Sequence, residues 1–143
     1  MAAPQPEPNL PPLSALGLNL QRLPAPLPIW HGPVDRGQWS TAAQAVAESG
    51  GRLVAMWGVD RCNVGGGTLA CAAFAVLEGL VWLELPLGAG TPSFPDLSHV
   101  FACAVRMQRA MTDLSGIHAE GSTDPRPWLD HGVWPIASPP LRH

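Results

Sequence analysis

Three short apolar runs in the middle of the chain have the composition and spacing of β-strands. The first run, residues 52–59, is rich in strand-forming side chains. The next two, residues 69–77 and 80–87, flank Glu78-Gly79, which is a two-residue signal for a hairpin turn. We therefore expect one strand followed by a β-hairpin.

Two other segments have the pattern of helices. Ser40-Thr41 can cap a run of good helix formers that ends at Glu48, and Gly50-Gly51 follows as a stop signal. Residues 97–115 carry apolar side chains at steps of three and four, which predicts a longer amphipathic helix that covers the sheet. Gly116 stands where a left-handed C-cap is expected. The apolar stripe consists of Leu97, Val100, Ala104, Met107, Met111 and Leu114.

These elements predict an α+β fold, with a small mixed or antiparallel sheet of about three to four strands packed by two helices. Residues 1–33 contain nine of the 17 prolines, so we expect neither a regular helix nor an interior strand there. This Pro-rich arm is either a disordered leader or an extended segment that lies on an apolar surface. We therefore divide the chain into the arm, an α+β domain at residues 34–117 and an extended docking tail at residues 118–143.

Composition narrows the classes of partner. The chain has 143 residues and a net charge of −3, so it lacks the basic excess expected of a protein that binds nucleic acid. Charged residues make up 13% of the chain and hydrophobic residues 46%, a balance that leaves apolar surface for another protein to cover. A protein partner is therefore expected.

Targeting signals are not evident in the sequence. The first 12 residues have no basic region followed by an apolar run, and the longest apolar stretch, residues 69–87, is interrupted by Glu78-Gly79 and Glu84. We expect no membrane span. The chain is predicted to be cytoplasmic, and neither secreted nor membrane-spanning by its own signals.

Candidate metal ligands and thiols do not form a recognisable motif. The three cysteines, Cys62, Cys71 and Cys103, are widely spaced and are expected to be buried reduced thiols. A metal-dependent enzyme that uses His118, His131 and a carboxylate remains an alternative, although the spacing matches no helix-borne zinc motif. The tail residues available for such a site are His118, Glu120, Asp124, Asp130, His131 and His143.

The tail instead offers anchors for a protein interface. Trp128 and Trp134 are large rigid side chains in a segment stiffened by proline, although they could also fold back on the core of their own domain. Arg109 and Asp113 stand four residues apart on the predicted second helix, where they can pair along its surface.

The same region resembles the signature region of the 30-kDa subunit family of respiratory complex I. The resemblance extends to the matching subunits of membrane-associated group 4 nickel–iron hydrogenases of the formate hydrogenlyase type, which is the closer branch. In that family a Pro-Ser element precedes a helix with the pattern E-R-E/A-x-x-D-L-[FY]-G-[IV], and an Asp-x-Arg and a late Pro-Leu-Arg follow. Gln108 and Ser115 replace the usual Glu and aromatic residue. The residues that match are Pro92, Ser93, Arg109, Asp113, Leu114, Gly116, Ile117, Gly121, Asp124, Arg126, Pro140, Leu141 and Arg142.

The resemblance implies a structural subunit with no cofactor and no independent activity. Its partners would be a hydrogenase-like large subunit and iron–sulfur subunits, and these chains would hold the iron–sulfur clusters or a nickel–iron centre. An assembly or maturation factor for such a complex is the alternative. The expected partner-binding residues are Arg109, Asp113, Gly116, Arg126, Trp128, Trp134 and Arg142.

Overall fold

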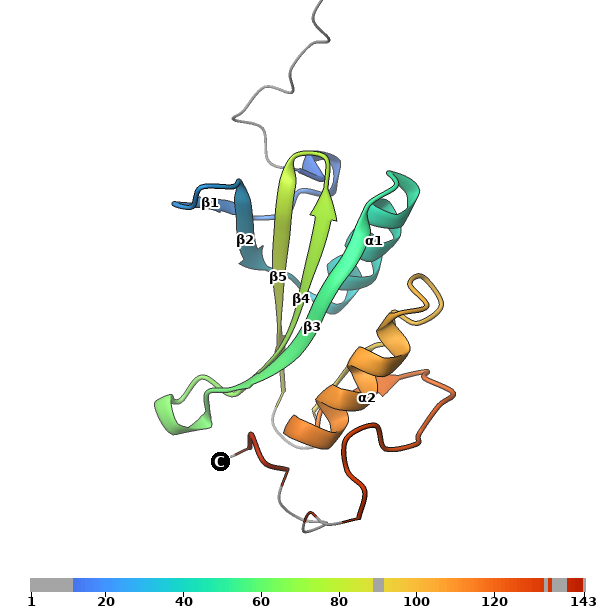
Figure 1. Ribbon diagram of the computed structural model, residues 1–143. Coiled ribbons are helices and arrows are strands. Elements are labelled where there is room, and N and C mark those ends of the chain that lie inside the picture. The colour runs from blue at the N-terminus through green and yellow to red at the C-terminus, as the bar shows by residue number, and fades with distance from the viewer. Residues whose placement is uncertain (1–11, 89–91, 133, 135–138, 143) are drawn as a thin grey trace, which may run out of the picture.

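The chain folds as an α+β domain built on one five-stranded mixed sheet, as a computed structural model shows (Figure 1). The structure describes residues 12–88, 92–132, 134 and 139–142. The strands of the sheet lie in the order β1-β2-β5-β4-β3, and β6 and β7 form a separate two-stranded parallel pair. The elements are η1 Ser14–Leu16, β1 Gln21–Leu23, β2 Ile29–Pro33, α1 Arg36–Glu48, β3 Arg52–Asp60, η2 Cys62–Val64, β4 Thr68–Val76, β5 Gly79–Leu87, β6 Ser93–Pro95, α2 Ala104–Ser115 and β7 His118–Glu120.

The antiparallel strands β3, β4 and β5 confirm the three strands predicted from the apolar runs. Val76 and Gly79 face each other across the ladder, so the hairpin turn consists of Leu77 and Glu78. The turn therefore lies one residue earlier than the Glu78-Gly79 signal indicated. Gly79 instead opens β5 with a φ of 132°, a backbone conformation that favours glycine.

Strand β2 corrects the expectation for the Pro-rich arm. It pairs parallel with β5 and antiparallel with β1, so it is an interior strand despite ending at Pro33. A Cβ atom on Gly32 would lie 2.1 Å from the carbonyl oxygen of Asn19, so the preceding chain crosses β2 at close range. Proline is tolerated because it stands at the end of the strand. Four leucines of the arm also pack against the core, namely Leu13, Leu16, Leu18 and Leu20.

Helix α1 begins four residues before the predicted cap. Its N-cap is Asp35, which accepts a hydrogen bond from the backbone N–H of Gln38 at 2.7 Å. The side chain of Gln38 accepts one in return from the N–H of Asp35 at 3.0 Å. This capping box satisfies two amides that the helix itself leaves unpaired, and it replaces the predicted cap at Ser40-Thr41.

Helix α2 is shorter than the predicted helix 97–115. The chain makes one separate turn after Leu97, and regular helix begins only at Ala104. The side chain of Asp96 accepts the N–H of Ser98 at 3.0 Å, which holds that separate turn. The C-terminus of α2 is as predicted, because Gly116 adopts a φ of 68° and its N–H binds the carbonyl oxygen of Thr112.

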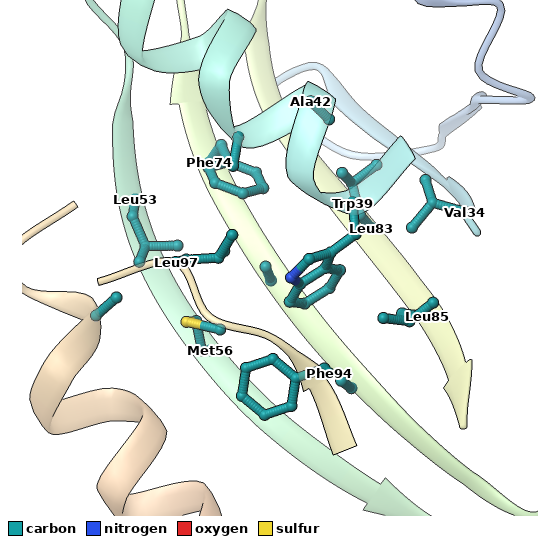
Figure 2. Close-up of a cluster of buried hydrophobic side chains, with 14 of the residues drawn as sticks. Val34, Trp39, Ala42, Leu53, Met56, Phe74, Leu83, Leu85, Phe94 and Leu97 are labelled. Atoms are coloured by element: carbon teal, nitrogen blue, oxygen red, sulfur yellow. The ribbon is translucent and has the colours of Figure 1, made fainter. Parts of the chain in front are cut away.

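Both helices lie on one face of the sheet and enclose the core. Figure 2 shows Trp39 of α1 beside Phe94 of β6, with both rings on the strands. The side chain of Trp39 is 1% exposed, and its indole N–H donates to the carbonyl oxygen of Pro95 at 3.1 Å. Its ring meets Phe94 edge-on with centroids 5.8 Å apart. This contact joins α1 to the small ladder that also carries the tail.

The opposite face of the sheet carries a small aromatic cluster. Trp82 of β5 contacts Trp57 at a centroid distance of 5.8 Å and His31 at 4.2 Å. Cys71 on the intervening strand is fully buried, and burial raises the pKa of its thiol to about 11. Cys62 and Cys103 are exposed, so the expectation of three buried thiols is wrong for these two.

No helix in the described part of the chain is both long enough and apolar enough to cross a membrane.

Gly58 of β3 lies very close to the end of α2. A Cβ atom there would lie 2.5 Å from Cδ1 of Ile117 and 3.0 Å from Cβ of Ser115, and both residues are buried. We expect Gly58→Ala to lower the free energy of unfolding by about 1–3 kcal/mol through overpacking. Gly88→Ala is the matched control, because its new methyl group would meet no atom within 4 Å. Equal midpoints for the two variants in urea titrations would contradict this packing.

Candidate functional site

The predicted docking tail begins with strand β7, which pairs with β6, and then folds back along α2 (Figure 1). We call residues 124–130 the hook. Arg109 of α2 donates from Nε to the carbonyl oxygen of Arg126 at 2.6 Å and from Nη2 to that of Pro127 at 2.8 Å. Its Nη1 also lies 3.4 Å from Oδ2 of Asp124. One guanidinium therefore binds three groups of a segment that has no regular secondary structure.

Asp113, one helical turn further along α2, binds the other end of the hook. Its Oδ2 accepts the backbone N–H groups of Trp128 at 2.7 Å, Leu129 at 2.6 Å and Asp130 at 3.2 Å. Partial burial opposes ionisation, but these hydrogen bonds and the charge of Arg109 outweigh it and lower the pKa of Asp113. The two side chains were expected to pair along the helix, and their hydrogen bonds go to the hook instead.

Asp124 and Arg126 form a tight pair within the hook. The carboxylate accepts hydrogen bonds from Nε of Arg126 at 2.8 Å and from its Nη2 at 2.7 Å. These bonds, together with the nearby charge of Arg109, hold the pKa of Asp124 well below its usual range. The side chain of Arg126 remains 75% exposed, so its outer surface is free for solvent or a partner.

Trp128 lies at the surface of the hook beside two guanidinium groups. The Cζ atoms of Arg106 and Arg109 are 5.2 Å and 5.1 Å from the centroid of its ring, which is cation–π range. Trp128 is 41% exposed and Leu129 is 39% exposed. The hook thus presents two large apolar side chains to the outside while its backbone is bound to α2.

The last described residues return to the end of α2. The N–H of Leu141 donates to the carbonyl oxygen of Leu114 at 2.8 Å. A Cβ atom on Gly116 would lie 3.3 Å from a guanidinium nitrogen of Arg142, so the helix end and Arg142 are close neighbours. Trp134 is half-buried. Residues 135–138, which the predicted docking tail includes, lie outside the described residues.

Gln108 organises the approach to α2, a role that the sequence did not indicate. Its side chain is buried, its Oε1 accepts the N–H of Leu97 at 2.8 Å, and its Nε2 donates to Oδ1 of Asp96 at 2.6 Å. Burial opposes the charge of Asp96, but the hydrogen bonds from Gln108 and Ser98 prevail and lower its pKa. A buried amide needs both a donor and an acceptor nearby. The two partners of Gln108 lie 11 and 12 residues earlier in the chain, so the sequence pattern does not reveal them.

The candidate metal ligands of the tail are spread over separate contacts. Glu120 binds Arg36 and the hydroxyl of Ser93, and Asp124 is held by the arginines of the hook. His118 lines a pocket together with Asp124, Thr112 and Ser122. Among the described residues, no three His, Cys, Asp or Glu side chains lie close enough to hold a metal ion. His143 lies outside the described residues.

The fold and the hook define a small α+β domain whose C-terminal segment is bound to its second helix. The family model described as "Respiratory-chain NADH dehydrogenase, 30 Kd subunit" matches residues 33–143. The chain therefore belongs to this family, and the resemblance noted in the signature region is confirmed. It is a 30-kDa-type subunit of a respiratory complex.

Solved structures share the fold at low sequence identity. A trypsin-resistant fragment of Nqo5 matches with a TM-score of 0.64 at 17% identity, over 78% of this chain and 92% of that one. A chain of the membrane-bound sulfane sulfur reductase, an archaeal respiratory membrane complex, matches with a TM-score of 0.70 at 16% identity, over 86% and 75% of the two chains. No curated protein matches the chain.

Asp113→Asn tests the hook. Replacing the carboxylate with a neutral amide should weaken three charge-assisted hydrogen bonds and lower the free energy of hook opening by about 1–2 kcal/mol. Hydrogen exchange at the amides of Trp128, Leu129 and Asp130 should accelerate about 5- to 30-fold, since ~1.4 kcal/mol is tenfold. Glu48→Gln, at the exposed end of α1, removes the same charge and should leave these amides unchanged.

The same contact should respond to pH. The pKa of Asp113 is lower in the folded state, so its stabilising effect is present above the unfolded value, near 4, and is lost as the pH falls through the folded pKa. Protection of the three amides, corrected for intrinsic exchange, should fall in that window for the native chain and stay flat for Asp113→Asn. A flat profile in both would contradict the assignment.

Gln108→Glu tests the buried amide. The new carboxylate would keep the bond to Leu97 but would face Asp96 at the 2.6 Å contact that the amide now makes. Because two carboxylates in contact repel each other, either Asp96 or the new glutamate would bind a proton. The pKa of that carboxyl group would then be higher in the folded state than in the unfolded state. The variant should lose about 1–3 kcal/mol at pH 7.5 and recover part of it at pH 5. The Gln38→Glu control, at the third position of α1, should show no such recovery, because Glu also suits a capping box.

Proposed function

We propose that the chain is a non-catalytic structural subunit of a complex I-like or group 4 nickel–iron hydrogenase complex. It docks on the hydrogenase-like large subunit through the hook and the residues that follow it. The observation that carries this proposal is the outward position of Trp128 and Leu129 on a segment whose backbone is already bound to α2. Aromatic anchors of this kind dominate the energy of protein interfaces.

Two groups of the predicted partner-binding residues have different tasks in this proposal. Arg109, Asp113 and Gly116 position the hook and the helix end, because their hydrogen bonds and backbone geometry serve their own chain. A rigid hook lowers the entropy lost when the partner binds. The residues that contact the partner are Arg126, Trp128, Trp134 and Arg142.

The redox chemistry of the complex belongs to other chains in this proposal. The large subunit and the iron–sulfur subunits hold the clusters or nickel–iron centre, and this subunit aligns them. It lies on the cytoplasmic side and is held at the membrane through the complex. The family membership supports the assignment to a respiratory complex. The hydrogenase-like branch rests on the resemblance carried by Ala110, Leu129, His131 and Trp134-Pro135.

Co-expression with the hydrogenase-like large subunit tests the docking surface. Trp128→Ala should reduce co-purification at least tenfold, because it removes a central aromatic anchor at a cost of ~2 kcal/mol or more, while changing the melting temperature of the isolated chain little. Arg126→Ala and Trp134→Ala should act in the same direction. Leu77→Ala is the control, because that side chain is 90% exposed in the β4–β5 turn.

Two outcomes would count against a permanent docking subunit. Equal losses of co-purification and of melting temperature for Trp128→Ala would assign the residue to folding. Absence of the chain from the mature, active complex, despite binding during assembly, would select the assembly-factor alternative.

A further inference from the structure

A groove lies between the start of α2 and the hook, and Trp128 is part of its lining. Its polar lining consists mainly of Arg106, Arg109, Arg126 and Asp124, and Met107 and Trp128 add apolar surface. The groove therefore combines three guanidinium groups and one carboxylate with an aromatic ring.

The carboxylates near this groove are already bound. Asp124 accepts hydrogen bonds from Arg126 and Arg109, and Asp113 accepts three backbone N–H groups. Arg106 is exposed, and the contact that the structure gives it is with the face of Trp128. Three guanidinium groups against one carboxylate leave the groove with an excess of positive charge in a chain whose net charge is −3.

We propose that this groove binds an acidic segment of a partner protein. Arg106 and Arg126 hold carboxylate groups of that segment, and an apolar side chain between them lies on Trp128. Guanidinium groups bind carboxylates through paired N–H donors. Because Arg106 and Arg109 lie against the ring of Trp128, their positive charge is next to the site where the apolar side chain would bind. The apolar side chains of Met107 and Trp128 in the lining favour a peptide over a phosphate backbone.

This inference rests on the proposed function for the source of the segment, which is a subunit of the same complex. It adds the chemistry of the contact: acidic side chains that flank an apolar one. Charge complementarity of this type raises association rates and makes binding sensitive to salt.

A peptide titration of the full chain tests the groove directly. The probe is the acetylated and amidated pentapeptide Glu-Glu-Leu-Glu-Glu, and the readout is the indole N–H resonance of Trp128, assigned by its loss in Trp128→Phe. The peptide should shift this resonance saturably at low salt, and 300 mM salt should weaken binding several-fold through screening. The neutral peptide Gln-Gln-Leu-Gln-Gln should cause little shift.

Matched variants separate the groove from general charge. Arg106→Gln should raise the dissociation constant of the acidic peptide at least fivefold while leaving the hook in place, because Arg106 makes no hydrogen bond to the hook among the described residues. Arg126→Lys, which keeps the charge but loses the planar donors, should weaken binding less. Arg52→Gln on β3 changes the same charge at an exposed site outside the groove and should have no effect.

In the peptide titration, any of three results would overturn the proposal. These are an unchanged dissociation constant in Arg106→Gln, equal shifts with the neutral peptide, or displacement of the acidic peptide by inorganic phosphate at the same concentration.

Failure of the groove proposal is distinct from failure of the proposed function. If the large subunit co-purifies equally with the native chain and with Arg106→Gln, the docking function stands and the groove proposal falls. If the native chain does not co-purify at all, the proposed function falls, whatever the peptide does.

Discussion

The segments that flank α2 depend on side chains of its last two turns for their backbone hydrogen bonds. Arg109 donates to carbonyl oxygens of the hook, and Asp113 accepts the N–H groups that follow them. Gln108 does the same for the incoming chain through the N–H of Leu97. The N–H of Leu97 is buried with Gln108 and would cost free energy if it were unpaired, whereas the exposed backbone of the hook is held in place by charge-assisted hydrogen bonds. The helix therefore supplies hydrogen bonds that strands would otherwise provide.

This arrangement gives a physical reason for the pattern that links the chain to its family. An arginine, an aspartate four residues later and a glycine after the helix fix the hook and the direction in which the chain leaves α2. Arg109 and Asp113 form their hydrogen bonds with the hook of their own chain. These bonds position Trp128, which is exposed at the surface. Folding and docking thus depend on the same few residues of α2 in different ways.

Local signals account for the elements that the sequence predicted correctly. Strands 52–59, 69–77 and 80–87 carry strand-forming residues, and Gly116 meets the steric requirement of a left-handed cap. The starts of both helices were wrong for a common reason. Asp35 competes with Ser40 as a cap, and the apolar spacing of residues 97–103 suits either helix or turns, so local propensity could not choose between them.

The sequence by itself determined the α+β class, strand β3, the β4-β5 hairpin, the end of α2 and the family, because each depends on neighbouring residues or on an ordered motif. Only the tertiary structure decided that β2 lies inside the sheet, that Gln108 is buried against Asp96, and that Asp113 binds the hook. These contacts join residues far apart in the chain or depend on the direction of one side chain. These contacts contribute to stability only after the helices have packed on the sheet.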